Sequence, residues 1–158
     1  MWMQIVAGVS VVFIVGSLAF FPWLQRRRQK ALRRSLKLFR LQREHLEAQF
    51  LDMARLSGKP EGLQWSDCDW LSPVTFARDR KSGMLTAFVS MNVRFQAIEG
   101  SEMEGIAAVS TVREAAAVFH FYRGRWGTGG RALFNMDPYD AIERLAGQYD
   151  PIPAETLP

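Results

Sequence analysis

The chain has 158 residues and a formal net charge of +4, which leaves room for one domain. Nine of its twenty Lys and Arg residues lie between residues 26 and 43, where no Asp or Glu occurs, whereas from residue 44 onward eleven basic residues are outnumbered by sixteen acidic ones. The positive charge therefore belongs to one segment, we predict no nucleic-acid partner, and the single cysteine excludes an internal disulfide.

Residues 1–24 contain no charged side chain. As a helix, about 22 such residues at roughly 1.5 Å each would span a hydrocarbon core of about 30 Å. Trp2 and Trp23 lie near the two ends, where indole rings favour the membrane interface. We predict that residues 1–24 form a transmembrane signal-anchor helix.

A basic cluster follows this apolar segment directly. Because cytoplasmic loops collect Lys and Arg, the cluster predicts an inner-membrane, single-pass protein with its N-terminus outside and its C-terminal domain in the cytoplasm. We also expect these side chains to contact the anionic headgroups of the lipid bilayer. The six residues are Arg26, Arg27, Arg28, Lys30, Arg33 and Arg34. A cleaved signal peptide, with small residues at 17–19, is the alternative, although the basic cluster resists translocation.

The segment 25–43 is predicted to be a basic juxtamembrane helix that continues to residue 57, because it lacks Pro and Gly. Apolar residues recur along it with a spacing of 4-3-7-4-3, interrupted at Arg43. Two interpretations remain open: a coiled-coil seam that dimerises, or a helix that covers a sheet from Leu46 onward. The residues are Leu32, Leu36, Phe39, Leu46, Phe50 and Met53.

Residues 85–98 alternate apolar and polar side chains, which predicts an antiparallel strand with one solvated face. Residues 74–78 are expected to pair with it across the loop 79–83, which ends in Gly. A second hairpin is predicted from residues 115–122, with a turn at Arg123-Gly124 and a return through Trp126 to Phe134.

Asp137-Pro138 predicts the start of a short helix, with Asp as the N-cap and Pro at the first helical position. The Pro-rich tail, residues 150–158, is expected to be mobile. Residues 44–149 are thus predicted to form a small α+β domain: a helix packed on a twisted antiparallel sheet of four or five strands, with a short C-terminal helix. In outline this is similar to the cystatin-like and nuclear-transport-factor-2-like architectures.

Two stretches, VTFARDRKSGMLTAFVSMNVRFQAIEG and FYRGRWGTGGRALFNMDPYDAIERL, resemble uncharacterised small single-pass membrane proteins of planctomycete-type bacteria. The resemblance covers most of residues 44–147, and the run from Gly124 to Asn135 is its most distinctive part. It implies this architecture and membrane attachment, and it implies no activity or site.

The run 123–131 is rich in Gly and Arg, which could cradle a phosphate. A phosphate-binding loop, however, opens a helix with a Lys-Ser/Thr pair, and this run leads into a strand. It predicts instead a bulge or a close backbone approach that glycine permits. Asp67-Cys68-Asp69 offers too few ligands for a metal, so we predict a polar strand end and no metal or cofactor.

Arg94, His120 and Tyr122 are the candidate lining of a ligand pocket on a cupped sheet, although a lone strand histidine can equally be a surface or satisfied core residue. No catalytic constellation is found, so we expect no enzyme. The predicted function is a membrane-anchored protein-interaction or scaffold domain with a protein partner or a second copy of itself. The alternative is a small-ligand-binding or enzymatic domain, again tethered to the membrane.

Overall fold

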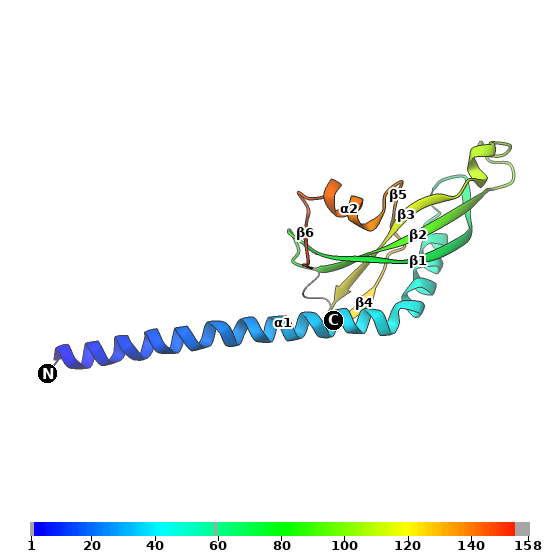
Figure 1. Ribbon diagram of the computed structural model, residues 1–158. Coiled ribbons are helices and arrows are strands. Elements are labelled where there is room, and N and C mark those ends of the chain that lie inside the picture. Colours follow the sequence, from blue (N-terminus) through cyan, green and yellow to red (C-terminus); the bar gives the residue numbers. More distant parts are fainter. Residues whose placement is uncertain (1, 59, 154–158) are drawn as a thin grey trace.

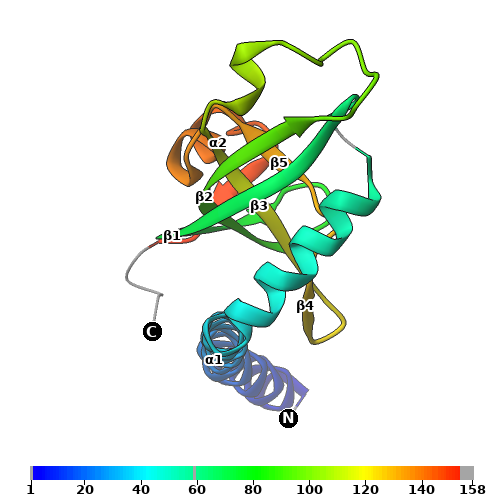
Figure 2. The same ribbon diagram turned by 90° about the vertical axis from the view of Figure 1, so that its right-hand side faces the viewer.

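A long helix, a six-stranded antiparallel sheet and a short helix make up the structure (Figure 1). This computed structural model describes the backbone of residues 2–58 and 60–153 and the side chains of residues 22–58 and 60–153. The N-terminal part of the long helix projects away from the sheet, and its C-terminal part turns to lie against the sheet (Figures 1 and 2). The α+β class predicted from the sequence is confirmed.

The sheet has the strand order β4-β3-β2-β1-β6, and β5 also pairs with β3. The predicted number of strands, four or five, was too low. Strands β4, β5 and β6 have only three residues each, which is too short to give a clear alternating pattern in the sequence. In chain order the elements are α1 (Trp2–Leu56), β1 (Leu63–Asp79), β2 (Leu85–Ala97), the 3-10 helix η1 (Ala107–Ser110), β3 (Arg113–Tyr122), β4 (Arg125–Gly127), β5 (Ala132–Phe134), α2 (Pro138–Arg144) and β6 (Tyr149–Pro151).

Both predicted hairpins are present. Strand β1 pairs with β2 across the turn at residues 80–84, as expected, and in this register Val74 lies opposite Val89. The return strand of the second hairpin is divided into β4 and β5, both of which pair with β3. Strand β6 pairs with the end of β1, so Asp150 and Pro151 of the expected tail belong to the sheet.

The alternating pattern of β2 places one set of apolar side chains toward α1, as predicted. The expectation of one solvated face was wrong for the first half of the strand, because Thr86, Phe88 and Ser90 are at most 2% exposed. Helix α2 and Tyr149 cover them, and the Phe88 and Tyr149 rings meet edge to face at 5.2 Å. Arg94 and Gln96, further along, are exposed. The sheet is therefore a middle layer between α1 and α2 (Figure 1).

Helix α1 buries its apolar face against the sheet of the same chain. Leu36, Phe39, Leu46 and Phe50 are at most 2% exposed, and Phe39 lies 4.8–5.6 Å from three other rings, those of Phe76, Phe119 and Trp126. Aromatic pairs at such separations add to the free energy of burial. The seam thus covers a sheet, and the core extends N-terminally beyond residue 44 into residues 25–43, the predicted basic juxtamembrane helix.

Arg43, which interrupts the seam, has a structural role. Its guanidinium donates hydrogen bonds to the carbonyls of Leu71 and Ser72, and its Nε lies 2.6 Å from a carboxylate oxygen of Glu47. The β1–β2 register shifts between Trp70 and Val74, which removes these carbonyls from the ladder. Arg43 therefore satisfies acceptors that the bulge leaves unpaired.

Two contacts fasten α1 to the return strands. The buried Trp126 indole donates to the Ser35 carbonyl at 2.8 Å. Gly130 has a φ of +71°, and a Cβ built there would lie 2.4 Å from the backbone N of Ala54. The predicted close backbone approach in the Gly-rich run is confirmed.

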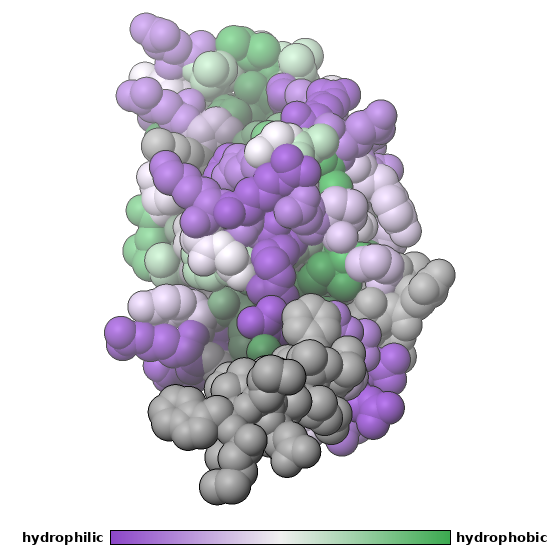
Figure 3. Space-filling view, turned by 90° about the vertical axis from the view of Figure 1, so that its left-hand side faces the viewer, coloured by the Kyte–Doolittle hydropathy of each residue, from purple (hydrophilic) through white to green (hydrophobic). Residues whose placement is uncertain are grey.

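The side chains described here, residues 22–58 and 60–153, include no helical stretch long and apolar enough to cross a membrane. The span predicted at residues 1–24 lies, except for its last three residues, outside those side chains, although its backbone from Trp2 onward is helical within α1. Figure 3 views the molecule from this end and shows hydrophilic side chains over much of the facing surface.

Candidate functional site: an arginine-lined cleft

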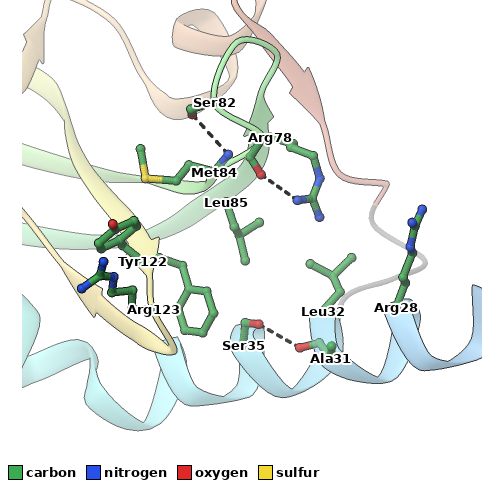
Figure 4. Close-up of a pocket in the computed structure, with 12 residues that line it drawn as sticks. Arg28, Ala31, Leu32, Ser35, Arg78, Ser82, Met84, Leu85, Tyr122 and Arg123 are labelled. Atoms are coloured by element: carbon green, nitrogen blue, oxygen red, sulfur yellow. Dashed lines mark hydrogen bonds between the residues drawn. The ribbon is translucent and has the colours of Figure 1, made fainter. Parts of the chain in front are cut away.

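A cleft of about 690 Å³ lies where α1 leaves the sheet, between the helix and the tips of the two hairpins (Figure 4). Its size falls within the range of small-molecule sites. The walls combine basic, hydroxyl and apolar side chains. The lining residues are Arg28, Ala31, Leu32, Ser35, Arg78, Ser82, Gly83, Met84, Leu85, Phe121, Tyr122 and Arg123.

Helix α1 supplies one wall through residues that share a helical face. Arg28, Leu32 and Ser35 follow a 4-3 spacing, and Phe39 continues it into the buried core. The same spacing puts Arg26 and Arg33 near the opposite face. Arg28 is thus the member of the basic cluster that the helix turns toward the domain.

The β1–β2 hairpin supplies Arg78, whose Nη1 donates to the Gly83 carbonyl at 2.8 Å. Asp79 organises the turn, because its Oδ1 accepts from the backbone N of Lys81 at 2.9 Å and of Ser82 at 2.7 Å. Hydrogen bonds from Ser82 hold the pKa of the Asp79 carboxyl below its usual value. The turn that carries Arg78 is therefore well fixed.

The β3–β4 hairpin supplies Tyr122 and Arg123. Arg123 and Gly124 have φ values of 50° and 81°, and Tyr122 pairs with Arg125, as in a two-residue type I′ turn. The Arg123 guanidinium lies 5.2 Å from the centroid of the Tyr122 ring. This contact holds the cation by its attraction to the aromatic ring.

The electrostatic character of the cleft is one-sided. Of the residues that line it within the described part of the chain, three are arginines and none is acidic. The ion pairs found among the described residues involve other arginines: Arg43 with Glu47, Arg80 with Asp150 and Arg94 with Asp67. The cleft can therefore attract an anion, and nothing in its chemistry suggests a nucleophile with a base beside it.

No protein-family model, curated protein or solved structure matches this chain.

The three residues predicted to line one pocket do not meet. Arg94 is exposed and lies 3.7 Å from Asp67, whereas Tyr122 lines the cleft. Thr86 pairs with His120, and Arg94 lies eight residues further along β2, which corresponds to about 26 Å. Aromatic side chains of α1 also fill the face of the sheet that was predicted to be concave and to hold a ligand. The prediction that Arg94 and His120 line the same pocket was wrong, because the register between β2 and β3 places them far apart on the sheet.

His120 is half-buried and has a local partner. Its Nδ1 lies 3.2 Å from Oγ1 of the fully buried Thr86. Burial, with the charge of Arg131, lowers the pKa of His120 below its usual value. His120 therefore behaves as a neutral histidine whose ring is hydrogen-bonded within the sheet, which is the alternative to a pocket residue given above.

Cys68 is shielded rather than reactive. Its Sγ lies 3.5 Å from Sδ of Met91, and burial, followed by the charges of Asp67 and Asp69, raises the pKa of the thiol to about 12. Within the described residues no three His, Cys, Asp or Glu side chains gather as a metal site would require.

All six residues predicted to contact the membrane surface are exposed, and one of them, Arg28, also lines the cleft. Sequence reasoning missed Arg78 and Arg123 as site residues. The available signal was their position beside turns: Arg78 precedes the β1–β2 loop, and Arg123 occupies a turn position that normally favours Asn, Asp or Gly.

A second surface lies on the β2–β3 connection, residues 98–112, at the end of the domain farthest from the N-terminus of α1 (Figure 1). Four large apolar side chains there are 37–49% exposed, and three exposed glutamates lie among them. The apolar residues are Ile98, Met103, Ile106 and Val112, and the acids are Glu99, Glu102 and Glu104.

The β2–β3 connection is held in place by hydrogen bonds. The backbone N of Ile98 and Oγ of Ser101 donate to the Gly62 carbonyl at 3.0 and 3.1 Å. Val109 of η1 is buried in the core. The exposed apolar side chains therefore stand on an ordered segment.

Proposed function

We propose that this chain is a membrane-anchored protein-docking domain. Residues 1–24 span the inner membrane, the basic cluster lies among anionic headgroups on the cytoplasmic side, and the α+β domain presents the β2–β3 connection to a protein partner. The absence of charge in residues 1–24 and the density of Lys and Arg immediately after them support the anchoring and its orientation.

The observation that carries the docking role is the apolar and acidic surface of the β2–β3 connection. Side chains such as Ile106, 47% exposed, and Val112, 49% exposed, would lose contact with water on binding. Because the segment is already ordered, little conformational entropy is lost when a partner binds. Glu102 and Glu104 favour a partner segment that carries Lys or Arg beside its apolar residues.

Tethering strengthens such an interaction. A partner confined to the same membrane meets the domain at a high effective concentration, so a small interface suffices. A second copy of this chain fits less well, because four of the six residues in the seam that could have dimerised, Leu36, Phe39, Leu46 and Phe50, are buried in its own core. The alternative of a ligand-binding domain is favoured by one observation, the arginine-lined cleft.

A photoreactive benzophenone amino acid at Ile106 tests the docking role in cells. We expect a discrete adduct that disappears when Ile98 and Met103 are both replaced by Ser. Tyr139→Ser is the matched control, since Tyr139 is a large exposed residue, 67% accessible, on α2. An adduct that survives the loop substitutions, or no adduct at all, contradicts the docking role.

The orientation is tested separately by an enzyme active only in the periplasm, fused after Pro158. We expect it to be inactive because the basic cluster keeps the domain in the cytoplasm. Activity of the fusion would overturn the membrane placement and leave the crosslinking result to stand on its own.

A further inference from the structure

The cleft is lined by both arginines and large apolar side chains. A ligand that contacts both kinds of side chain must be amphipathic. In Figure 4, Arg28 and Arg78 lie at one end and Tyr122 and Arg123 at the other, with Leu32 and Leu85 between them. Met84 and Phe121 add further apolar surface. A small inorganic anion would use the arginines and leave the apolar floor exposed to water.

We infer that this cleft binds the headgroup of an anionic phospholipid, with the phosphate at the end where Arg28 and Arg78 lie and the glycerol and first acyl carbons against Leu32 and Leu85 (Figure 4). The guanidinium fork matches phosphate geometry and donates two hydrogen bonds at once. Arg123, at the other end of the cleft, adds positive charge that favours an anionic headgroup over a neutral one (Figure 4). The ligand identity rests on the membrane placement proposed above, whereas the anion-binding chemistry rests on the cleft alone.

The distance along α1 agrees with a headgroup ligand. If residues 1–24 span the hydrocarbon core, Arg28 lies four residues beyond it, or about 6 Å along the helix axis. The headgroup layer on each side of a bilayer is about 5–8 Å thick. Arg28 and the hairpin tips that face it would therefore be level with lipid phosphates.

The backbone at Arg123 is an independent argument. With a φ of 50°, this position suits Asn or Gly, and an arginine there is strained. Strained residues of this kind cluster at active sites and ligand-binding positions. The task available to Arg123 is its charge, because its guanidinium forms no ion pair among the described residues and lines the cleft.

The test uses the full chain in phosphatidylcholine nanodiscs that contain a small fraction of photoactivatable phosphatidylglycerol, with labelled peptides identified by mass spectrometry. We expect labelling in the peptides that contain residues 78–85 and 121–123. The double variant Arg78→Gln, Arg123→Asn should reduce it at least about tenfold, since Arg78 donates a charged hydrogen bond to the phosphate and Arg123 supplies positive charge beside the headgroup. Asn suits the turn, so this variant keeps its fold, which the unfolding midpoint verifies.

The matched control is the double variant Arg55→Gln, Arg144→Gln, which removes the same charge from exposed positions that neither line the cleft nor belong to the basic cluster. Unchanged labelling in this control supports the cleft, and an equal loss would show general attraction of the lipid to positive charge and overturn the inference. Equal labelling by photoactivatable phosphatidylcholine would also overturn it. Complete competition by excess inorganic phosphate would replace the lipid with a free phosphate as the ligand.

The two proposals can fail separately. Cleft labelling together with an active periplasmic fusion refutes the cytoplasmic placement and leaves the lipid site intact. An inactive fusion without cleft labelling refutes the lipid site and leaves the anchored docking domain intact.

Discussion

Gly130→Ala is the sharpest test of how α1 meets the sheet. At this position the backbone of the β4–β5 connection passes directly against the last turns of α1. An added Cβ would lie 2.4 Å from the N atom of Ala54 and 2.6 Å from the carbonyl carbon of Met53. Ordinary contacts need about 3.5–4.0 Å, so helix and connection must separate by about 1 Å.

Two terms set the expected loss of stability. An L-residue in the left-handed region costs about 1–2 kcal/mol. Forcing extra volume into a packed contact costs about 1–3 kcal/mol more. We therefore expect the free energy of unfolding to fall by about 2–5 kcal/mol, which corresponds to a midpoint roughly 8–20 °C lower for a domain of this size.

Gly129→Ala is the matched control. A Cβ at Gly129 meets no atom within 4 Å, and its φ is outside the left-handed range. Both substitutions reduce the freedom of the unfolded chain equally, by about 0.4–1 kcal/mol, so the difference between them isolates the folded-state clash. The assay is thermal unfolding of the full chain in a neutral detergent, followed by circular dichroism.

A Gly130→Ala midpoint equal to that of Gly129→Ala would refute the packing of α1 on the β4–β5 connection. Ala54→Gly provides a further check. It should not rescue Gly130→Ala, because the short distances are to backbone atoms rather than to the Ala54 side chain.

Three further outcomes are expected. Trp126→Phe should lower the free energy of unfolding by about 1–3 kcal/mol in denaturant titrations, because the indole bond to the Ser35 carbonyl is lost; no change would mean that this bond is not formed. Alkylation of Cys68 by iodoacetamide at pH 8 should be about 1,000-fold slower in the native protein than in the unfolded chain. The reason is that a thiol pKa of about 12 in place of 9.0 leaves much less of the reactive thiolate. Equal rates would contradict the burial of Cys68. The Asp137 carboxylate caps α2 by accepting a hydrogen bond from Tyr139 N at 2.7 Å. Asp137→Ala should therefore destabilise the fold by about 1 kcal/mol in thermal unfolding, whereas Asp137→Ser should be nearly neutral because Ser also caps helices. Equal effects of the two substitutions would argue against the cap.

Features that depend on neighbouring residues could be predicted from the sequence. The alternation in residues 85–98 identified β2 and its core-facing side, because a strand repeats every two residues. Asp137-Pro138 identified the start of α2, and the glycines of residues 124–130 identified a close approach, since each acts through its own backbone. The uncharged segment and the basic cluster are likewise fixed by order along the chain.

Only the tertiary structure decided which element covers which surface. The polar-looking face of β2 is buried because α2 and Tyr149, more than fifty residues away, pack on it. The seam of α1 covers its own sheet because Phe39 and Phe50 find aromatic rings on β1, β3 and β4. The arginine cleft needs three segments, around residues 28, 78 and 123, to meet. These arrangements depend on contacts between residues far apart in the sequence. Periodicity and turn residues, in contrast, report only on the conformation of neighbouring residues.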